Sequence, residues 1–452
     1  MTDSGPRRPG ESEDRRGAAL LQHYRQAYGR SAALVARAPG RVNLLGEHTD
    51  YNGLPVLPMA IDRSVLIAAT PRTDGVVNVG NVASPFTART YTLADRIAPF
   101  ADGDWGNYSK AAAQAVMRLC DGVARGADLL VDGNIPSGAG LSSSSALVVA
   151  TALALLAAND REVPYTTLAE CLPDAERYVG TLSGGMDHAV SLLAQAGHAL
   201  RIDFVPLRVR TVPLPAGYSV VVCHSLVTAE KSRGAKRAYN LRVVECRLAC
   251  RVLEGALGGG LPRGLRALGD LVSLFPGRPL LEFLEYLDLP ERPLSLDELA
   301  AVIGTSPERL RADCESGADA GDRFNVRRRA RHVLAEAERV EQAEARLRAG
   351  DALGFGQLMT ASHASCRDDY EISGPELEAL VAAALRAGAV GARLTGAGFG
   401  GCTVNLVPDA GLHAFLRRID RDFYASRLPA GAPAGDYRYI FKPQAGAQVT
   451  RA

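Results

Sequence analysis

Residues 134–146, NIPSGAGLSSSSA, place two glycines and four consecutive serines between a strand pattern and an apolar helix pattern. Gly138 and Gly140 allow backbone N–H groups to approach an anion closely, because a Cβ would block that approach. The serines at 142–145 fall in the first turn of the expected helix, where the dipole is positive and hydroxyls can cap the helix, bind phosphate or ligate Mg²⁺. The segment predicts a phosphate-binding turn or, alternatively, a glycine-rich turn with a serine cap.

A second group of chemically capable side chains, Glu47, His48 and Asp50, directly follows a strand pattern. Such a cluster of donors and acceptors suits the hydroxyls of a sugar, or else a structural loop network. No second histidine stands four residues from His48 on a helical pattern, so we favour sugar binding over a metal site.

The sequence does not support either of two common nucleotide-binding motifs, the P-loop and the dinucleotide-binding GxGxxG. No GxxxxGK[ST] occurs, which argues against a P-loop NTPase. GAGFGG at 396–401 satisfies GxGxxG, with Asp420 about 20 residues later, but the strand pattern CTVNLV follows it instead of a helix. We therefore interpret GAGFGG as a glycine-rich strand connection.

A chain of 452 residues is long enough for two or three packed domains, and its strand and helix patterns predict mixed α and β structure. We expect two domains. Residues 1–17 are polar and predict a disordered tail. Strand patterns and an apolar helix fill 18–205, and a proline-rich crossing near 206–216 marks the domain boundary. The C-terminal domain, 206–452, carries helical spacing at 232–257, 327–349, 351–366 and 374–388, and two returning strands near its end.

Composition narrows the class of ligand. A formal charge of +1 gives no basic field for nucleic acid or anionic membranes, so a small neutral or phosphorylated substrate is expected. The longest apolar run, 147–158, is too short to span a bilayer, and the N-terminus lacks a hydrophobic signal core. The eight cysteines match no zinc or CxxC spacing. We expect a cytoplasmic protein with reduced thiols.

Three motifs carry a resemblance to a known family. GRVNLLGEHTDYNG at 40–53 resembles the galactokinase signature, NIPSGAGLSSSSA resembles the ATP loop of the GHMP kinases, and LTGAGFGGCTVNLV at 394–407 resembles their third motif. The segments at 175–181, 183–189, 236–249, 329–340 and 362–381 are also similar to galactokinases. The resemblance covers nearly everything after residue 30. It implies an α+β, two-domain GHMP kinase fold with the active site in the interdomain cleft.

The resemblance also implies roles for individual residues. Asp187 would lie near the anomeric hydroxyl, as a base or an orienting group, and Arg41 would stabilise charge on the transferred phosphoryl group and hold Asp187. Ser144 and Glu176 would hold Mg²⁺. The expected sugar-binding residues are Arg41, Glu47, His48, Asp50, Gly184, Asp187 and Tyr239. The expected ATP-binding residues are Trp105, Tyr108, Pro136, Gly138, Gly140, Leu141, Ser142, Ser143, Ser144 and Ser145.

The sequence departs from the family pattern at two positions. His188 stands where the family commonly has glutamine, and Gly374 stands where it has cysteine.

The resemblance favours an ATP- and Mg²⁺-dependent sugar 1-kinase, a galactokinase, expected as a monomer. An N-acetylgalactosamine kinase is an alternative, and so is a catalytically silent galactose and ATP sensor. The sensors lack a Ser-Ala pair in the loop, and Ser145 with Ala146 therefore favours the enzyme.

Overall fold

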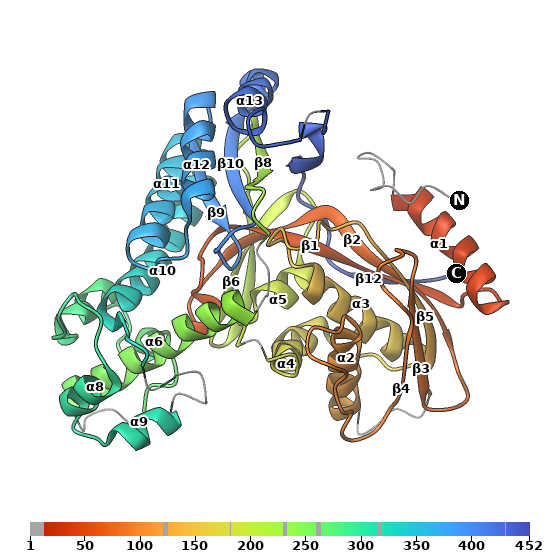
Figure 1. Ribbon diagram of the computed structural model, residues 1–452, viewed down its shortest axis with the longest axis horizontal. Helices are drawn as coiled ribbons and strands as arrows, with labels where there is room; N and C mark the ends of the chain where they lie inside the picture. The colour runs from red at the N-terminus through yellow and green to blue at the C-terminus, as the bar shows by residue number, and fades with distance from the viewer. Residues whose placement is uncertain are drawn as a thin grey trace.

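The structure is a computed structural model with two lobes, each built on a β-sheet covered by helices (Figure 1). It describes residues 13–120, 125–180, 182–228, 233–258, 264–313, 319, 321–429 and 431–452. This is the mixed α and β architecture that the sequence predicts. Among the described helices, none has a long enough apolar stretch to span a bilayer.

The first lobe contains a six-stranded sheet in the order β12-β1-β2-β5-β3-β4, antiparallel except for the parallel pair β3 and β5. Its strands are β1 (Leu34–Leu45), β2 (Leu57–Pro71), β3 (Val76–Asn81), β4 (Arg89–Thr92), β5 (Ala127–Gly133) and β12 (Gln448–Arg451). The helices of this lobe are α1 (Glu13–Tyr28), α2 (Gly106–Leu119), α3 (Ser143–Ala158), α4 (Tyr165–Arg177) and α5 (Met186–Leu193).

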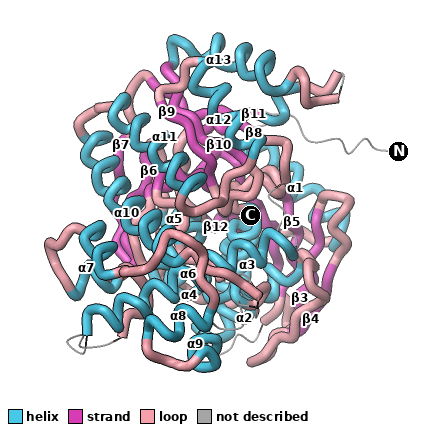
Figure 2. Tube along the Cα trace, turned by 60° about the vertical axis from the view of Figure 1, so that its left-hand side comes forward, coloured by secondary structure: helices cyan, strands magenta, loops and turns pink. Residues whose placement is uncertain are grey.

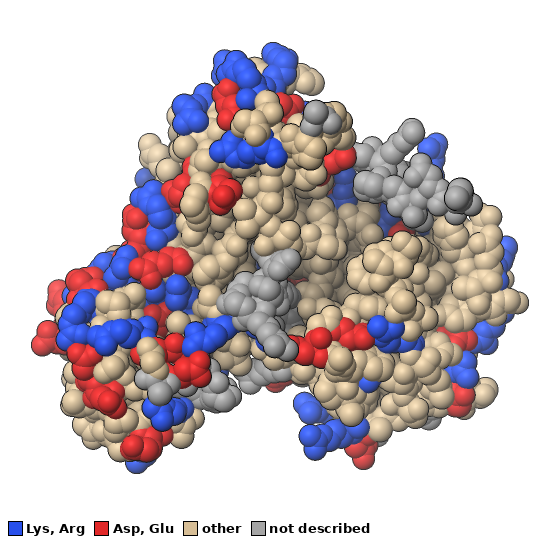
Figure 3. All heavy atoms as spheres, viewed as in Figure 1, with Lys and Arg blue, Asp and Glu red and all other residues tan. Residues whose placement is uncertain are grey.

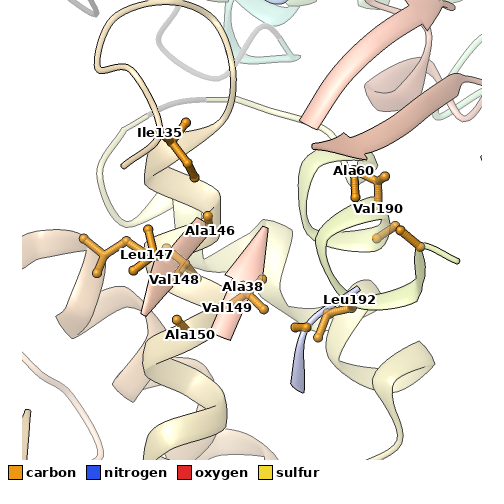
Figure 4. Close-up of a cluster of buried hydrophobic side chains, with 14 of the residues drawn as sticks. Ala38, Ala60, Ile135, Ala146, Leu147, Val148, Val149, Ala150, Val190 and Leu192 are labelled. Carbon is orange, nitrogen blue, oxygen red and sulfur yellow. The ribbon is translucent and has the colours of Figure 1, made fainter. Parts of the chain in front are cut away.

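Helix α3 is the centre of the first lobe's core. Its sequence, SSSALVVATALALLAA, is apolar on every face, as expected of a helix enclosed on all sides. It packs on β1 and β2 and against α2 and α5. Figure 4 shows this cluster, with Val149 of α3, Ala38 of β1 and Val190 of α5 among its members. The helix is therefore held rigidly, and so is the serine-rich turn at its start.

The first helix begins earlier than the sequence predicts. Residues 13–17 were expected in the disordered tail but form the first turn of α1. Arg16 is 4% exposed, and its guanidinium donates to Ser64 Oγ at 3.1 Å and to Asp132 O at 3.1 Å. Polar contacts to two distant strands, β2 and β5, therefore anchor the turn. Contacts of this kind produce no apolar periodicity in the sequence. Residues 1–12 of that tail lie outside the described residues.

The second lobe contains a four-stranded sheet in the order β11-β8-β10-β9, with helices that dominate its volume (Figures 1 and 2). Its strands are β8 (Tyr218–His224), β9 (Gly391–Thr395), β10 (Cys402–Pro408) and β11 (Arg438–Phe441). Its helices are α6 (Arg233–Leu257), α7 (Asp270–Leu274), α8 (Leu296–Ile303), α9 (Pro307–Asp313), α10 (Val326–Arg348), α11 (Ala352–Asp368), α12 (Pro375–Ala387) and α13 (Leu412–Ile419). The four long helical patterns and the two returning strands of the sequence are confirmed within two residues at each end.

The passage between the lobes runs through a β-hairpin. Strands β6 (His198–Phe204) and β7 (Leu207–Pro213) pair antiparallel, and the expected boundary at 205 and 206 falls in their turn. The C-terminal strand β12 pairs with β1, so the end of the expected second domain returns to the first sheet. The chain crosses between the lobes more than once, and the division at 205 remains a prediction.

Candidate active site

A cleft of about 470 Å³ is lined by residues from both lobes. Figure 3 shows the molecule hollowed between its lobes, with charged side chains of both signs interspersed over the projection that contains α8 and α9. The expected residues on the cleft wall are Arg41, Glu47, His48, Asp50, Trp105, Tyr108, Pro136, Gly138, Gly140, Leu141, Ser142, Ser143, Ser144, Gly184, Asp187 and Tyr239. Of the other two, Ser145 is buried behind the wall, and the side chain of Glu176 lies outside the described residues.

Asp187 lies in the first turn of α5, where the helix dipole favours a negative charge. Its Oδ1 accepts a hydrogen bond from Arg41 Nε at 2.7 Å. Its Oδ2 accepts from Ser142 Oγ at 2.5 Å and from Ser145 Oγ at 3.4 Å. The Asp187 side chain is 24% exposed and that of Arg41 is 7% exposed, so the carboxylate is the partner that faces the cleft.

Arg41 is placed by an irregularity in strand β1. The register between β1 and β2 shifts between Pro39 and Arg41, and such a bulge re-aims a side chain. The backbone N–H of Arg41 donates to Leu141 O at 3.2 Å, and its Nη1 donates to Gly140 O at 2.5 Å. The arginine therefore ties the strand, the glycine turn and Asp187 together.

The turn before α3 alternates between ordinary and left-handed backbone. Gly138, Gly140 and Ser142 have φ values of 68°, 74° and 60°, so every second residue is left-handed. A Cβ on Gly138 would lie 2.3 Å from Thr228 Cγ2. The first N–H groups of a helix have no intrahelical partner, and this turn brings those of α3 to the cleft. The Ser142 hydroxyl does not cap the helix, because it donates to Asp187.

One end of the cleft is apolar. Trp105 lies there, donating from Nε1 to Thr87 O at 2.9 Å and meeting the Phe86 ring edge-on at a centroid distance of 5.7 Å. The apolar wall residues that the sequence analysis did not identify include Val65, Phe86, Val131, Ile135 and Leu147. They come from separate strands, a turn and a helix, and no local pattern groups them.

The opposite end is polar and includes Asp50. The Oδ2 of Asp50 accepts from Met186 N at 3.2 Å, and a Cβ on Gly184 would lie 2.3 Å from the same carboxyl group. Desolvation, with a smaller contribution from the charge of Asp187, raises the pKa of Asp50 to about 6. A side chain at position 184 would therefore clash with Asp50, so the close packing here requires glycine.

Glu47, on the wall at this end, forms a buried ion pair. It is 2% exposed, and its Oε2 is 2.8 Å from Nη2 of Arg393, which is fully buried. Its Oε1 accepts from Asn43 Nδ2 and from Gly396 N, each at 3.2 Å. Glu47 therefore connects β1 to the glycine-rich turn that begins at Gly396.

Helix α10 supplies two supporting residues that the sequence analysis did not identify. Glu336 is fully buried, and its Oε1 accepts from Gly46 N at 2.9 Å and from Glu47 N at 3.3 Å. His332, one turn earlier, contacts Glu47 O through Nε2 at 3.1 Å. The segment at 329–340 carried the family resemblance, but only the fold shows that it holds the turn at 46–48.

The turn at 396–399 and Lys236 complete the wall. Lys236 donates from Nζ to Val179 O at 2.7 Å. The GAGFGG string had pointed to this turn without assigning a role to Ala397 or Phe399. His188 is fully buried on α5 and is not on the wall, so its imidazole does not face the cleft.

The described residues hold no group of three or more His, Cys, Asp or Glu side chains that could bind a metal. Mg²⁺ in phosphoryl transfer needs fewer, because it keeps waters and is bound by substrate phosphates with one or two protein ligands. Ser144 places a hydroxyl on the wall at the start of α3, which suits a hard cation beside a polyphosphate.

Family models match three segments of the chain. Residues 22–71 match the galactokinase galactose-binding signature, 107–195 match the GHMP kinases N terminal domain, and 343–425 match the GHMP kinases C terminal model. The chain is 40% identical to a galactokinase of Roseiflexus sp. (strain RS-1), over 90% of this chain and 91% of that protein. It is 34% identical to a galactokinase of Dictyostelium discoideum, over 92% and 89%.

Solved structures give the same picture. The crystal structure of Lactococcus lactis galactokinase complexed with galactose superposes with a TM-score of 0.75 and 28% identity, covering 95% of this chain and 99% of that one. A mevalonate kinase of Methanococcus jannaschii has a TM-score of 0.54 at 16% identity, covering 87% and 96%, and is similar in fold alone.

Proposed function

Because the chain belongs to the galactokinase family of the GHMP kinases, it phosphorylates galactose with ATP, and we propose that the acceptor is the anomeric hydroxyl. The products are then galactose 1-phosphate and ADP. The observation that carries the proposal is the position of Asp187, between Arg41 and the serines that begin α3. A carboxylate for the acceptor and a helix N-terminus for phosphate meet at that point.

Each end of the cleft receives one substrate in this proposal. The adenine packs on the apolar wall around Trp105 and Tyr108, and the phosphates lie over the turn at 138–144, at the positive end of α3. Galactose lies at the polar end, beside Asp50, Gly184 and Tyr239. The anomeric oxygen then faces the γ-phosphorus in line with the bond to the β-phosphate.

In the reaction, the anomeric oxygen forms a bond to the γ-phosphorus while the bond between that phosphorus and the β,γ-bridging oxygen breaks. Asp187 accepts the proton of the hydroxyl or orients the hydroxyl for attack. Arg41 holds Asp187 and compensates the charge on the transferred group. Most of the rate enhancement comes from positioning and electrostatics, because phosphoryl transfer needs little covalent chemistry from the protein.

Mg²⁺ belongs to this proposal as the cofactor of ATP, with Ser144 and Glu176 as its protein ligands. When bound, it would neutralise charge on the β- and γ-phosphates. The Ser144 hydroxyl stands on the cleft wall at the start of α3, where the phosphates are expected.

Location and assembly are also proposals. The seven described cysteines are free thiols, which suits a reduced cytoplasmic environment. Both substrates are placed in a cleft lined by one chain, so a monomer suffices for activity.

A coupled ADP-release assay over galactose, N-acetylgalactosamine, glucose and arabinose tests the proposal. We expect the highest kcat/KM with galactose and a product whose phosphorus couples to the anomeric proton in a ³¹P NMR spectrum. A higher kcat/KM with N-acetylgalactosamine would make the chain an N-acetylgalactosamine kinase. Activity on no sugar, with galactose and ATP still bound, would make it a sensor.

A further inference from the structure

Both ring nitrogens of His48 are engaged by the protein. Nε2 lies 3.1 Å from Ala397 O, and Nδ1 lies 2.9 Å from the hydroxyl of Tyr51. A carbonyl oxygen only accepts, so Nε2 carries the hydrogen. Desolvation and the nearby His332 lower the pKa of His48 to about 3, and the ring is therefore neutral at neutral pH. Nδ1 then accepts a hydrogen bond from Tyr51.

The direction of the next two contacts follows from this assignment. The Tyr51 hydroxyl gives its hydrogen to His48, so it accepts from the Tyr370 hydroxyl at 2.6 Å. The Tyr370 oxygen in turn accepts from the thiol of Cys246 at 3.3 Å. Burial raises the pKa of Cys246 to about 11 and raises the pKa values of both tyrosines, so all three groups keep their protons. One directional relay of hydrogen bonds runs from Cys246 through Tyr370 and Tyr51 to His48. It ends on the carbonyl oxygen of Ala397.

Ring packing fixes the imidazole in the same place. The His48 ring lies 4.8 Å from the Tyr370 ring and 5.1 Å from the Tyr239 ring, between centroids. Its backbone is left-handed, with φ at 61°, which a residue with a side chain keeps only when its surroundings hold it. His48 and Tyr239 both line the polar end of the cleft, whereas Tyr370 lies outside its wall.

We propose that Tyr51 and Tyr370 are positioning residues for galactose, acting through His48 to hold Tyr239 and the turn at 396–399 at the sugar end. The inference rests on the proposed function, because it assigns galactose to that end. Among the described residues, the hydrogen bonds of the relay join His48 to Tyr51, Tyr370 and Ala397. Arg41 and Asp187 are bonded instead to each other and to the turn before α3. We therefore expect the relay to affect sugar binding more than the transfer step.

A double-mutant cycle on Tyr51→Phe and Tyr370→Phe distinguishes an effect transmitted along the relay from independent effects on packing. Each variant removes one buried hydroxyl and leaves a neighbour without its hydrogen-bond partner, so we expect the KM for galactose to rise about tenfold in each. Because Tyr370 acts through Tyr51, the double variant should match Tyr51→Phe alone. The KM for ATP and kcat should stay within about twofold in all three.

The matched control is Tyr424→Phe, which deletes another buried tyrosine hydroxyl, bonded to His224 O and Tyr437 O in the second lobe. It should leave both KM values unchanged. Multiplicative effects in the double variant, of about 100-fold, or unchanged KM for galactose in both single variants, would overturn the relay.

The ¹⁵N NMR signals of the His48 ring provide a readout that needs no turnover. The wild-type ring should carry its proton on Nε2 down to about pH 4, and Tyr51→Phe should shift Nδ1 toward the value of a nitrogen without a donor. Cys246→Ser keeps a donor and should leave the ring signals unchanged. A wild-type ring protonated on Nδ1 would contradict the relay. Failure of the wild type to phosphorylate galactose would contradict the proposed function alone.

Discussion

The two ends of the cleft are built by different physical means. At the end that we assign to the nucleotide, the cleft is lined by the turn at 138–144, the start of α3 and apolar side chains that include Phe86 and Trp105. At the end that we assign to galactose, Arg393 pairs with Glu47 and Tyr370 packs on His48. Glu336 accepts from the backbone of the turn that carries Glu47 and His48.

The difference teaches where each kind of substitution acts. Removing one partner of a buried ion pair, such as that of Glu47 with Arg393, leaves an uncompensated buried charge and costs several kcal/mol. At the nucleotide end, the sensitive feature is the left-handed backbone, which only glycine adopts without strain. Asp187 stands where the two ends meet, so it should be the most sensitive position of all.

Asp187→Asn should give the largest effect. The amide cannot take the proton of the hydroxyl and does not pair with Arg41 as a carboxylate does, so kcat should fall by ~10²–10⁴. The coupled ADP-release assay measures the change. Asp203→Asn is the control, because Asp203 is 28% exposed and also pairs with an arginine, Arg201, at 3.1 Å. An unchanged kcat in Asp187→Asn would remove this carboxylate from the mechanism.

Gly140→Ala should damage the nucleotide end next. At φ 74° an alanine is strained, and its Cβ would lie 3.1 Å from Thr395 O. We expect the KM for ATP to rise about tenfold or more, since the strain displaces N–H groups that bind phosphate. Gly197→Ala has the same strain, at φ 81° with nothing within 4 Å, and should lower stability without changing KM. An equal KM for ATP in the two variants would show that Gly140 has no role in phosphate binding.

Trp105→Ala should have a smaller effect confined to ATP. Loss of an aromatic contact with the adenine should raise the KM for ATP about fivefold and leave the KM for galactose unchanged. Trp105 is the single tryptophan of the chain, so wild-type fluorescence provides a second measurement. Its emission should change on titration with ATP and stay constant with galactose. A response to galactose alone would reverse the assignment of the two ends.

The smallest effect in free energy should be the change that Asp50→Asn makes to the stability of the fold. The folded-state pKa of Asp50, about 6, lies above its ordinary value of 3.8, so the protonated form favours folding. Wild-type stability should therefore decrease as pH rises from about 4 to 6 and then stay level for this group. The variant lacks that loss and should gain about 1 kcal/mol relative to wild type above pH 6. Urea unfolding at pH 4.5 and 7.5 measures the difference in stability between the variant and the wild type. An equal difference at both pH values would contradict the raised pKa of Asp50.

Much of the fold follows from local pattern. The apolar run at 147–158, the segment ADLLVDG and the spacing at 374–388 predict α3, β5 and α12, because buried helices and strands carry their signal in adjacent residues. The first turn of α1 was missed because Arg16 bonds to strands 48 and 116 residues away. The return of β12 to the first sheet was missed for the same reason.

The candidate site divides in a similar way. The turn at Gly138, Gly140 and Ser142 could be predicted from the sequence because a turn before a helix is a local feature. The bond from Ser142 to Asp187 was not expected. Glu336 and His332 could not be assigned, because they act on a turn nearly 290 residues earlier in the chain. Phe86 has no distinguishing sequence pattern, and only the fold shows that its ring packs against Trp105.

The most direct test is a crystal structure of the enzyme with galactose and a non-hydrolysable ATP analogue. The account predicts that the anomeric oxygen lies within ~3.2 Å of the Asp187 carboxylate, with the γ-phosphate over the first turn of α3. An anomeric oxygen farther than one water from Asp187, or a γ-phosphate away from that turn, would contradict it.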